Sequence, residues 1–458
     1  MFKKIEIWVL YLVLVLVFIS YIVFGAMVIR EHDGGHHIPI ITPISKIAHF
    51  MSLIPRNFIR MGEHSVRSPN QVRGNRFEGQ YGFIGDVNKY EKYLILARYE
   101  GGLEESVVEL IDLQSFNVLH TWNPDINSFF EDIDKTEEWV NIMRDLNDSR
   151  YKMYHPIFFG DGSLLFQNNS PLIKIDKHSN LEWIKDDETY HHSIEQDSEG
   201  NFWVCVCYYP YKIDSVYVGN KLGNYSDDGI RKLSPTGEIL FDKSISEIFI
   251  ENDMEYLLFS VGDRVFTQDP IHLNDIQPVE KDTKYWKKGD VFISLRHQSM
   301  IILYRPKTDK IIWQSTGQFY NQHDVDILDV SRISVFDNNS KDTYYGNVVD
   351  GNNRVVIYDF ETGEYSYYLN ESLKTEDVRT VTEGTSQILP NGDLFIEESN
   401  YGRTLYFNSD GSLRWKHINR SNNGKLYSVS WSRILYSKDD IENVHKFLKI
   451  KDVDANNE

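Results

Sequence analysis

Three histidines occupy similar places in three successive stretches of the sequence. His192 opens HSIEQDSEGNFWV, His272 opens HLNDIQPV and His323 opens HDVDILDVSRISVFDNN. Each follows a loop-like segment and begins an apolar pattern typical of a strand. An imidazole can transfer a proton, bind an anion or attack an electrophile. If the three strands begin at one place in the fold, the three rings can form a shared site.

Two further polar residues lie in or between the second and third of these stretches. Asn274 lies two residues after His272, so both side chains point to one face of an extended segment. Arg296 ends the apolar run VFISLR, where a guanidinium can hold an anionic group. The structural alternative stays open, because the chain has 15 His and a single histidine in a strand is often a hydrogen-bonded structural residue.

The elements that would bring these residues together recur along the chain. A strand that ends near a turn former, a polar turn and a second strand that often closes on Trp occur six times. The copies span 110–122, 174–183, 232–241, 304–313, 358–367 and 406–415. A single four-stranded sheet cannot bury both faces, but sheets packed around an axis can. We therefore predict an all-β fold, a six-bladed β-propeller over residues 76–436, with its innermost strands around a central channel.

The main alternative for this all-β segment is a β-sandwich. It leaves unexplained a second recurring phrase, a polar turn with Gly followed by an apolar run, in GDGSLLF, SEGNFWV and PNGDLFI. The marks of WD40 and kelch repeats do not occur in the sequence. Helical patterns in the predicted extramembrane part are confined to 128–147 and 439–449, the latter in a C-terminal tail over 437–458.

An uncharged segment near the N-terminus predicts a membrane anchor over residues 1–30. Residues 7–29 carry no charge, and at about 1.5 Å per residue they can cross a hydrocarbon core of about 30 Å. A cleaved signal peptide has a shorter apolar core, about 7 to 15 residues, so we expect an uncleaved single-pass helix. Lys3 and Lys4 precede it, which puts the N-terminus in the cytoplasm and the propeller outside the cytoplasm. Residues 31–75 form a connector.

Composition narrows the partners of this chain. The formal net charge is −20, from 48 Lys plus Arg against 68 Asp plus Glu, and it argues against binding to nucleic acid. The cysteines, Cys205 and Cys207, point to one face of a strand in FWVCVCYY. A pair of small core residues is favoured over a disulfide between them. The sequence has no Cys/His spacing typical of zinc sites, and no cofactor is expected.

The run ISLRHQSMIILYRPKTDKIIWQSTGQFYNQHDVDILDVSRISVFDNN, residues 293–339, resembles the arylsulfotransferases. In these PAPS-independent enzymes an Arg-bearing strand is followed by a hairpin that closes on Trp, a Gln-His pair and a strand ending in Phe-Asp-Asn. The resemblance continues over residues 385–415, in the His191-His192 pair and in the His272-Leu273-Asn274 triplet. It covers roughly residues 80–435, and the family fold is a six-bladed propeller.

The resemblance implies transfer of a sulfuryl group from an aryl sulfate donor to a phenolic acceptor through a sulfohistidine, without metal or nucleotide. It implies roles for seven residues: His323 as the nucleophile, His272, Asn274 and Arg296 as ligands of the sulfuryl oxygens, His192 as a further imidazole, and Thr385 and His191 near the same mouth. The alternative is a non-catalytic propeller that binds an anionic ligand or a partner protein there. The sequence assigns no role to the insertion at 278–290 and does not define the oligomeric state.

Overall fold

The computed structural model describes residues 6–32, 38–66, 70–72, 74–130, 146–214, 216, 225–258, 269–343 and 346–455. The chain forms two compact units, residues 1–69 and 70–458. The first unit is helical and the second is built almost entirely of strands.

The N-terminal unit consists of two helices, α1 (Ile7–His32) and α2 (Ile41–Val66). Over residues 7–31, α1 is long and apolar enough to cross a membrane, a property that a signal sequence near the N-terminus shares. The predicted connector therefore contains a helix of 26 residues that the sequence analysis did not identify. The two helices meet through Ser45, whose Oγ lies 2.8 Å from Glu31 Oε2 and 3.1 Å from Arg30 Nη1.

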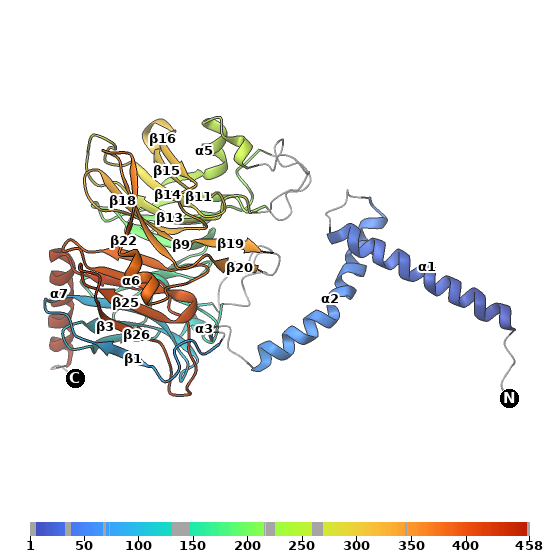
Figure 1. Cartoon of the computed structure of the whole chain (residues 1–458), viewed down its shortest axis with the longest axis horizontal. Coiled ribbons are helices and arrows are strands. Elements are labelled where there is room, and N and C mark those ends of the chain that lie inside the picture. Colours follow the sequence, from blue (N-terminus) through green and yellow to red (C-terminus); the bar gives the residue numbers. More distant parts are fainter. Residues whose placement is uncertain are drawn as a thin grey trace. The chain divides into compact units, whose positions relative to one another are not determined.

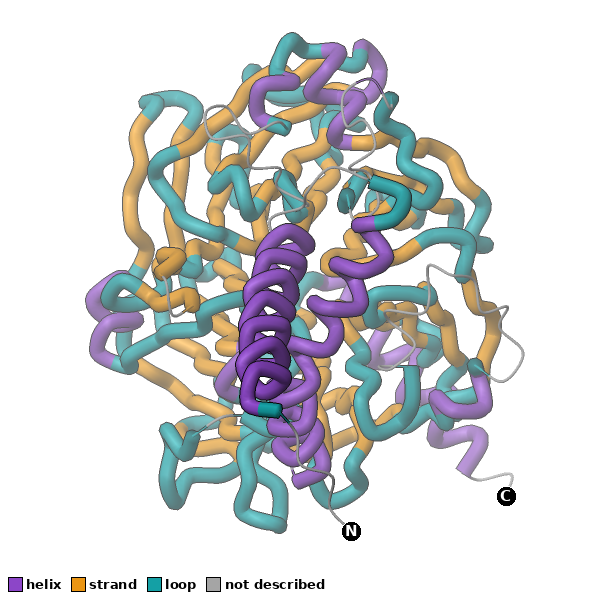
Figure 2. The backbone as a smooth tube through the Cα atoms, turned by 90° about the vertical axis from the view of Figure 1, so that its right-hand side faces the viewer, coloured by secondary structure: helices purple, strands orange, loops and turns teal. Residues whose placement is uncertain are grey.

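The second unit is a six-bladed β-propeller, as predicted. Each blade is an antiparallel sheet built on four strands (Figures 1 and 2). The strands of each blade are named below from the innermost strand, at the propeller axis, to the outer edge. Blade 1 contains β27 (Arg433–Leu435), β2 (Tyr93–Glu100), β3 (Glu105–Asp112) and β4 (Asn117–Trp122). Blade 2 contains β5 (Tyr154–Phe158), β6 (Leu164–Gln167), β7 (Leu172–Ile175) and β8 (Leu181–Lys185). Blade 3 contains β9 (Thr189–Gln196), β10 (Phe202–Cys207), β11 (Asp228–Leu233) and β12 (Ile239–Ser244).

The other three blades follow the same pattern. Blade 4 contains β13 (Leu273–Pro278), β14 (Val291–Leu295), β15 (Met300–Arg305) and β16 (Lys310–Thr316). Blade 5 contains β17 (His323–Ile327), β18 (Arg332–Asp337), β21 (Arg354–Asp359) and β22 (Glu364–Tyr368), with the hairpin β19 (Ser340–Thr343) and β20 (Gly346–Val349) inserted. Blade 6 contains β23 (Thr385–Ile388), β24 (Leu394–Glu398), β25 (Arg403–Phe407) and β26 (Leu413–Ile418), with β1 (Gly82–Gly85) as a fifth strand.

The two ends of the propeller unit add strands to blades 1 and 6. The C-terminal strand β27 pairs with β2 and so supplies the innermost strand of blade 1. The N-terminal strand β1 pairs with β26 at the outer edge of blade 6, where the two lie side by side in Figure 1. The first blade is therefore completed by the last strand of the chain.

Six apolar clusters hold the ring together, and each lies between two neighbouring blades. The strand β10 shows how one sheet serves two clusters. Phe202 and Val204 pack toward blade 2, whereas Trp203 and Cys205 pack toward blade 4. Because both faces of the sheet are covered, the strands of the blades carry nearly continuous apolar runs. Cys205 is buried and Cys207 half-buried, and both are free thiols.

The six hairpin phrases found in the sequence occupy equivalent places, as the third and fourth strands of the six blades. The tail contains α7 (Lys438–Ala455), as predicted, and its Val444 and Phe447 pack in the cluster between blades 1 and 2. Most of the predicted helix at 128–147 lies outside the described residues. The shorter helical elements are α3 (Ile126–Phe129), α5 (Ile245–Glu251), α6 (Asn370–Thr375), η4 (Glu255–Leu257), η5 (Pro306–Thr308) and η6 (Ser399–Tyr401).

Candidate active site

A cavity of about 340 Å³ lies at the end of the propeller where the innermost strands begin. We refer to it as the mouth cavity. Its walls are formed by Tyr154, Asn169, His192, His272, Arg296, His323, Thr382, Glu383 and Trp431. It thus brings together four of the residues singled out in the sequence, the three histidines and Arg296, and polar and aromatic groups accompany them.

The three histidines converge because each lies near an irregularity of an innermost strand: His192 within β9, His272 directly before β13 and His323 at the start of β17. The ring centroids of His192 and His272 are 5.1 Å apart, and those of His192 and His323 are 6.2 Å apart. Register shifts interrupt the pairing of β9, β13 and β17 with their neighbours near these residues. His192 and His272 adopt left-handed backbone conformations, with φ of 56° and 51°. Such bulges re-aim side chains, here toward the channel end.

The hydrogen bonds of His323 fix its neutral tautomer. Asn338 Nδ2 donates to the backbone oxygens of Thr380 and Glu383, so its Oδ1 is left as an acceptor. His323 Nδ1 lies 2.6 Å from that oxygen and must carry the hydrogen. Nε2 then has the lone pair, which accepts a long hydrogen bond of 3.2 Å from the Glu383 amide. A nitrogen lone pair at the wall of the mouth cavity can act as a nucleophile.

The surroundings keep the clustered imidazoles uncharged. Burial, followed by the positive charge of Arg296, lowers the pKa of His323 well below its usual range. Burial also lowers the pKa of His192 well below its usual range, and repulsion from the neighbouring histidines adds to it. A buried imidazole that stays neutral at physiological pH retains its lone pair. The imidazoles of His192 and His323 are therefore suited to act as nucleophiles or as hydrogen-bond acceptors, and not as sources of positive charge.

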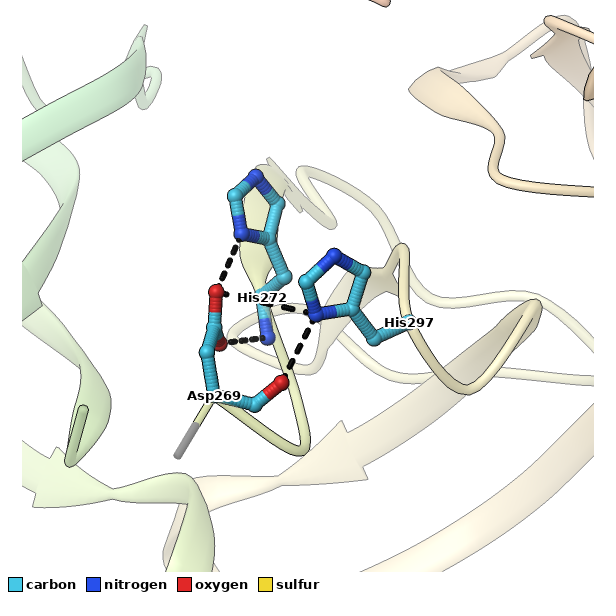
Figure 3. Close-up of side chains that lie close together, drawn as sticks. All are labelled: Asp269, His272 and His297. Carbon is cyan, nitrogen blue, oxygen red and sulfur yellow. Dashed lines mark hydrogen bonds and ion pairs between the residues drawn. The ribbon is translucent and has the colours of Figure 1, made fainter. Parts of the chain in front are cut away.

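Positive charge enters the mouth cavity through Arg296, which a chain of hydrogen bonds holds in place. Arg296 Nη1 donates to His297 Nε2 at 2.7 Å, so His297 must carry its hydrogen on Nδ1. That Nδ1 donates to the backbone oxygen of Asp269 at 2.7 Å. Asp269 Oδ2 lies 2.6 Å from His272 Nδ1 (Figure 3). One residue, Asp269, thus anchors both the arginine and a histidine of the mouth cavity.

Asp269 acts on His272 as a carboxylate. Burial raises the pKa of Asp269, but the hydrogen bond and charge of His272 outweigh burial and lower it overall. Because Asp269 occupies Nδ1 of His272, Nε2 is the ring nitrogen that remains for the mouth cavity. A carboxylate behind an imidazole orients the ring and stabilises its protonated form.

The side chains of Asp269, His272 and His297 lie close enough together to suggest a metal site, with ligand atoms within 4.8 Å of one another. Their hydrogen bonds favour another reading. Both ring nitrogens of His297 are engaged, by Arg296 and by the Asp269 backbone, and Nδ1 of His272 is engaged by the Asp269 carboxylate (Figure 3). The geometry fits a hydrogen-bonded support for the mouth cavity better than it fits a coordination sphere.

His191 and Asn274 lie behind the mouth cavity and do not appear among the described residues of its wall. His191 Nδ1 is 2.7 Å from His192 Nδ1, and burial lowers the pKa of His191 to about 4. Asn274 Nδ2 donates to the backbone oxygen of Gln322 at 2.7 Å. Since Gln322 directly precedes His323, Asn274 can fix the backbone that carries this histidine.

Thr385 lies in a second cavity of about 230 Å³, which we call the channel cavity. Trp431 belongs to the walls of both cavities. Thr385 Oγ1 donates to Asp324 Oδ2 at 2.8 Å, and the backbone N–H of Ser386 donates to the same oxygen at 2.7 Å. Thr385 therefore links blades 5 and 6 through the residue that follows His323, and its role in binding substrate stays a prediction.

The contact of Asp324 belongs to a series that joins the innermost strands. Ser193 Oγ accepts from the amide of Ile276 in the next blade, and Asp275 Oδ2 accepts from the amide of Val325. Burial raises the pKa of Asp324 to about 7, with a contribution from the charge of Glu195. These carboxyl groups therefore hold the wall of the channel, and their hydrogen bonds explain why they are buried.

Two aromatic residues give the mouth cavity a surface for a ring-shaped ligand. Tyr154 donates a hydrogen bond of 3.0 Å to Glu383 Oε1 and receives one from Lys152 Nζ. Trp431 has a left-handed φ of 63°, and its ring centroid is 6.3 Å from that of His323. The buried carboxylate of Glu397 accepts the amide of Trp431 and so holds this strained backbone.

Several functional candidates escaped the sequence analysis. Asn338 stands in the Phe-Asp-Asn motif, and His297 directly follows Arg296, so motif context could have raised both. Asp269 and Trp431 come from loops whose spatial position has no periodic signal in the sequence. Only the closed ring of blades brings them beside the histidines.

Comparisons with known proteins bear on the family of this chain. A family model described as Arylsulfotransferase (ASST) matches residues 152–420. No curated protein matches the chain. One solved structure with a similar arrangement is a protein of unknown function from Bacteroides caccae, which is 13% identical with a TM-score of 0.46 and coverage of 76% of this chain and 100% of that chain. Another is a streptogramin B lyase, 10% identical with a TM-score of 0.36 and coverage of 75% and 97%.

A third is the WD40 domain of Pan2 from Neurospora crassa, 8% identical with a TM-score of 0.37, covering 76% of this chain and 85% of that one. At these values the three structures carry no argument about function. The family match, in contrast, rests on the sequence and spans more than half of the chain. The matched residues include His192, His272, Arg296 and His323. This chain belongs to the arylsulfotransferase (ASST) family.

Proposed function

We propose that this protein transfers a sulfuryl group from an aryl sulfate to a phenolic acceptor, with His323 as the covalent carrier. The observation that carries the proposal is the fixed tautomer of His323, whose Nε2 lone pair borders a cavity that also contains Arg296 and His272. The family match supports the same class of transferase.

In the first half-reaction, His323 Nε2 releases the long hydrogen bond from the Glu383 amide and attacks the sulfur of the donor with the freed lone pair. The N–S bond forms while the bond from sulfur to the aryl oxygen breaks, and the aryl oxygen leaves with the electron pair. Arg296 neutralises charge on the sulfuryl oxygens. Protonated His272, supported by Asp269, gives its Nε2 proton to the departing phenolate. The imidazole now carries positive charge, which the Nδ1 hydrogen bond to Asn338 stabilises.

The second half-reaction reverses these steps. Neutral His272 accepts the proton of the acceptor phenol, and the resulting phenolate oxygen attacks sulfur. The N–S bond breaks and returns the electron pair to His323 Nε2. The products are the phenol of the donor and the sulfate ester of the acceptor, so no metal, nucleotide or redox partner is needed for balance. Tyr154 and Trp431 provide aromatic contact for the phenyl rings.

We further propose that α1 is an uncleaved, single-pass anchor with the N-terminus in the cytoplasm and the propeller outside it. The length and composition of α1 support a span, and the lysines before it support this orientation. On this proposal the anchor is residues 1–30, the connector 31–75, the propeller 76–436 and the tail 437–458. Sequencing of the N-terminus of the membrane-bound protein tests it, and a mature start beyond about residue 26 would contradict it.

The test of the reaction uses the full-length chain with a chromogenic aryl sulfate and an added phenol. We expect release of the coloured phenol together with formation of the new sulfate ester. His323→Ala and His323→Asn should abolish both, because they remove the covalent step. Arg296→Ala should lower turnover roughly 100- to 1000-fold, by analogy with a lost oxyanion donor. His178→Ala, at an exposed turn, is the matched control and should leave turnover unchanged.

A brief reaction with labelled aryl sulfate should leave an acid-labile, base-stable label on His323, as expected of an N–S bond. Mapping of the label to another residue would refute the nucleophile. Binding of aryl sulfate without any label or turnover in the folded wild-type chain would instead favour the non-catalytic propeller.

A further inference from the structure

The helix α2 has one continuous apolar face that no described residue of the N-terminal unit covers. The face is formed by Ile44, Ile47, Met51 and Ile54, which recur at intervals of three and four residues and so lie in one stripe. Their side chains are exposed, with 61% exposure for Ile47 and 52% for Met51. We refer to these four residues as the α2 stripe. In a water-soluble protein such a stripe normally faces a core.

Phe50, which is 64% exposed, borders the α2 stripe on the side of Lys46, and the edge of α2 toward α1 is packed. Ser45 and Ala48 are buried against α1, and Lys46 and His49 lie on the side of the helix away from the α2 stripe. Contact with α1 therefore uses a narrow edge of small residues and leaves the stripe outside. The sequence of α2 divides the helix into an apolar face and a polar face, whereas α1 is apolar on all its sides.

The contact with α1 holds the start of α2 beside the C-terminal end of the apolar segment of α1. Ser45 bonds to Arg30 and Glu31, the first charged residues after the apolar segment of α1. If α1 crosses a bilayer, these two charges mark the place where the hydrocarbon core ends. The first turns of α2 then lie at that boundary. In Figure 1, α2 runs crosswise to α1 rather than back along it.

We propose that α2 is an in-plane membrane helix whose α2 stripe inserts into the lipid surface beside the anchor. The inference rests on the proposed anchor and is separate from sulfuryl transfer. Continuity with α1 selects the bilayer as the partner, since Ser45 holds α2 at the polar end of the span. Helices with this division of faces bury their apolar side about 5–10 Å into the boundary between headgroups and acyl chains.

The test places single fluorescent probes along α2 in the full-length chain. Ile47→Cys and Met51→Cys lie in the α2 stripe, whereas the matched Lys46→Cys and His49→Cys lie away from it. Each variant is labelled with an environment-sensitive dye and reconstituted in vesicles of phosphatidylcholine and phosphatidylglycerol. The parent chain is labelled in parallel, so that reaction of Cys205 and Cys207 can be subtracted. Two quenchers are compared, a doxyl-labelled lipid and aqueous iodide.

We expect blue-shifted emission and doxyl quenching for probes at 47 and 51, and iodide quenching for probes at 46 and 49. Iodide quenching at all four positions would overturn the inference, because the stripe would face water. Doxyl quenching at all four would also overturn it, because α2 would cross the bilayer. Protection of 47 and 51 from both quenchers would show that protein covers the stripe and would refute a lipid partner.

A second measurement separates this inference from the proposed enzyme. Sulfuryl transfer by each labelled variant reports an intact propeller, because none of the four positions belongs to the mouth cavity. The fluorescence result does not depend on turnover. An inactive chain with the expected quenching would refute the enzyme and retain the membrane helix, and the converse result would refute only the helix.

Discussion

Asn338 Oδ1 lies 2.6 Å from His323 Nδ1, and the other end of the same amide is bound by two backbone oxygens. The amide therefore cannot rotate to present its NH2 group to the histidine. The consequence is that one buried side chain decides which nitrogen of His323 keeps its lone pair.

Removal of the Asn338 side chain should leave the tautomer of His323 unfixed. In Asn338→Ala, His323 can place its hydrogen on either nitrogen, so we expect formation of the sulfo-enzyme to slow by roughly 100-fold or more. Rapid-quench measurement of the labelled intermediate checks this. Asn338→Asp keeps an acceptor for Nδ1 and should recover part of the rate. A wild-type rate in Asn338→Ala would show that Asn338 does not set the tautomer.

Asp269→Asn tests the support of His272. The amide is neutral, so it stabilises protonated His272 less and weakens proton donation to the leaving phenolate. Turnover should fall roughly 100-fold for donors whose phenols are weak acids, and about tenfold or less for donors with acidic nitrophenols. A purely structural role would slow both donor types equally. Asp282→Asn, at an exposed carboxylate, is the control and should change neither rate.

The low pKa of His323 predicts how the first half-reaction depends on pH. A lowered pKa means that the neutral, nucleophilic form persists as pH falls through about 6.5, the ordinary value for histidine. Single-turnover labelling by a donor with an acidic nitrophenol, which needs little proton donation from His272, should therefore be constant across that value and decline only at lower pH. Arg296→Gln removes a positive charge near His323 and should move the decline toward higher pH. A decline centred near about 6.5 in the wild type would contradict the buried, neutral nucleophile.

Asp324 gives a prediction about stability. Burial raises its pKa to about 7, so the folded state keeps a proton that the unfolded chain loses above about pH 4. The free energy of unfolding should therefore fall as pH rises from about 4 to about 7, by on the order of 2–4 kcal/mol. Asp324→Asn cannot ionise and should lose less stability between about pH 5 and pH 8. Denaturant unfolding at both pH values measures the difference, and equal losses in the two proteins would refute the assignment.

The repeat was readable from the sequence because it rests on local chemistry. The third and fourth strands of each blade form a hairpin, and a polar turn between two apolar strands marks that hairpin in the sequence. Six such hairpins therefore predicted six blades. The convergence of His192, His272 and His323 followed from the same repeat. The partner of Thr385 could not be foreseen, because its hydroxyl bonds to Asp324 in the neighbouring blade. A side-chain contact of that kind leaves no period in the sequence.

The supporting residues could not be predicted for a related reason. Asp269 meets His272 from a loop, and Trp431 is held by Glu397, 34 residues away in the chain. Their positions depend on backbone conformations that bulky residues rarely adopt, such as the left-handed Trp431. Backbone propensities of the residue types argue against such conformations, so they cannot be predicted from the sequence and are seen only in the folded propeller. The helix α2 escaped notice because Pro55 interrupts its sequence pattern.

The closure of the ring by β27 has a consequence for the time at which the mouth cavity forms. The last strand carries the wall of the mouth cavity with it, since Trp431 lies two residues before β27. Ser432 accepts the amide of Ala97, 335 residues earlier, and this contact cannot form until synthesis is almost complete. Ribosomes add about 5–20 residues per second, so His323 leaves the ribosome seconds before its cavity can exist. A growing chain therefore carries His323 without its mouth cavity, and any reaction at this site has to wait until all the blades are present.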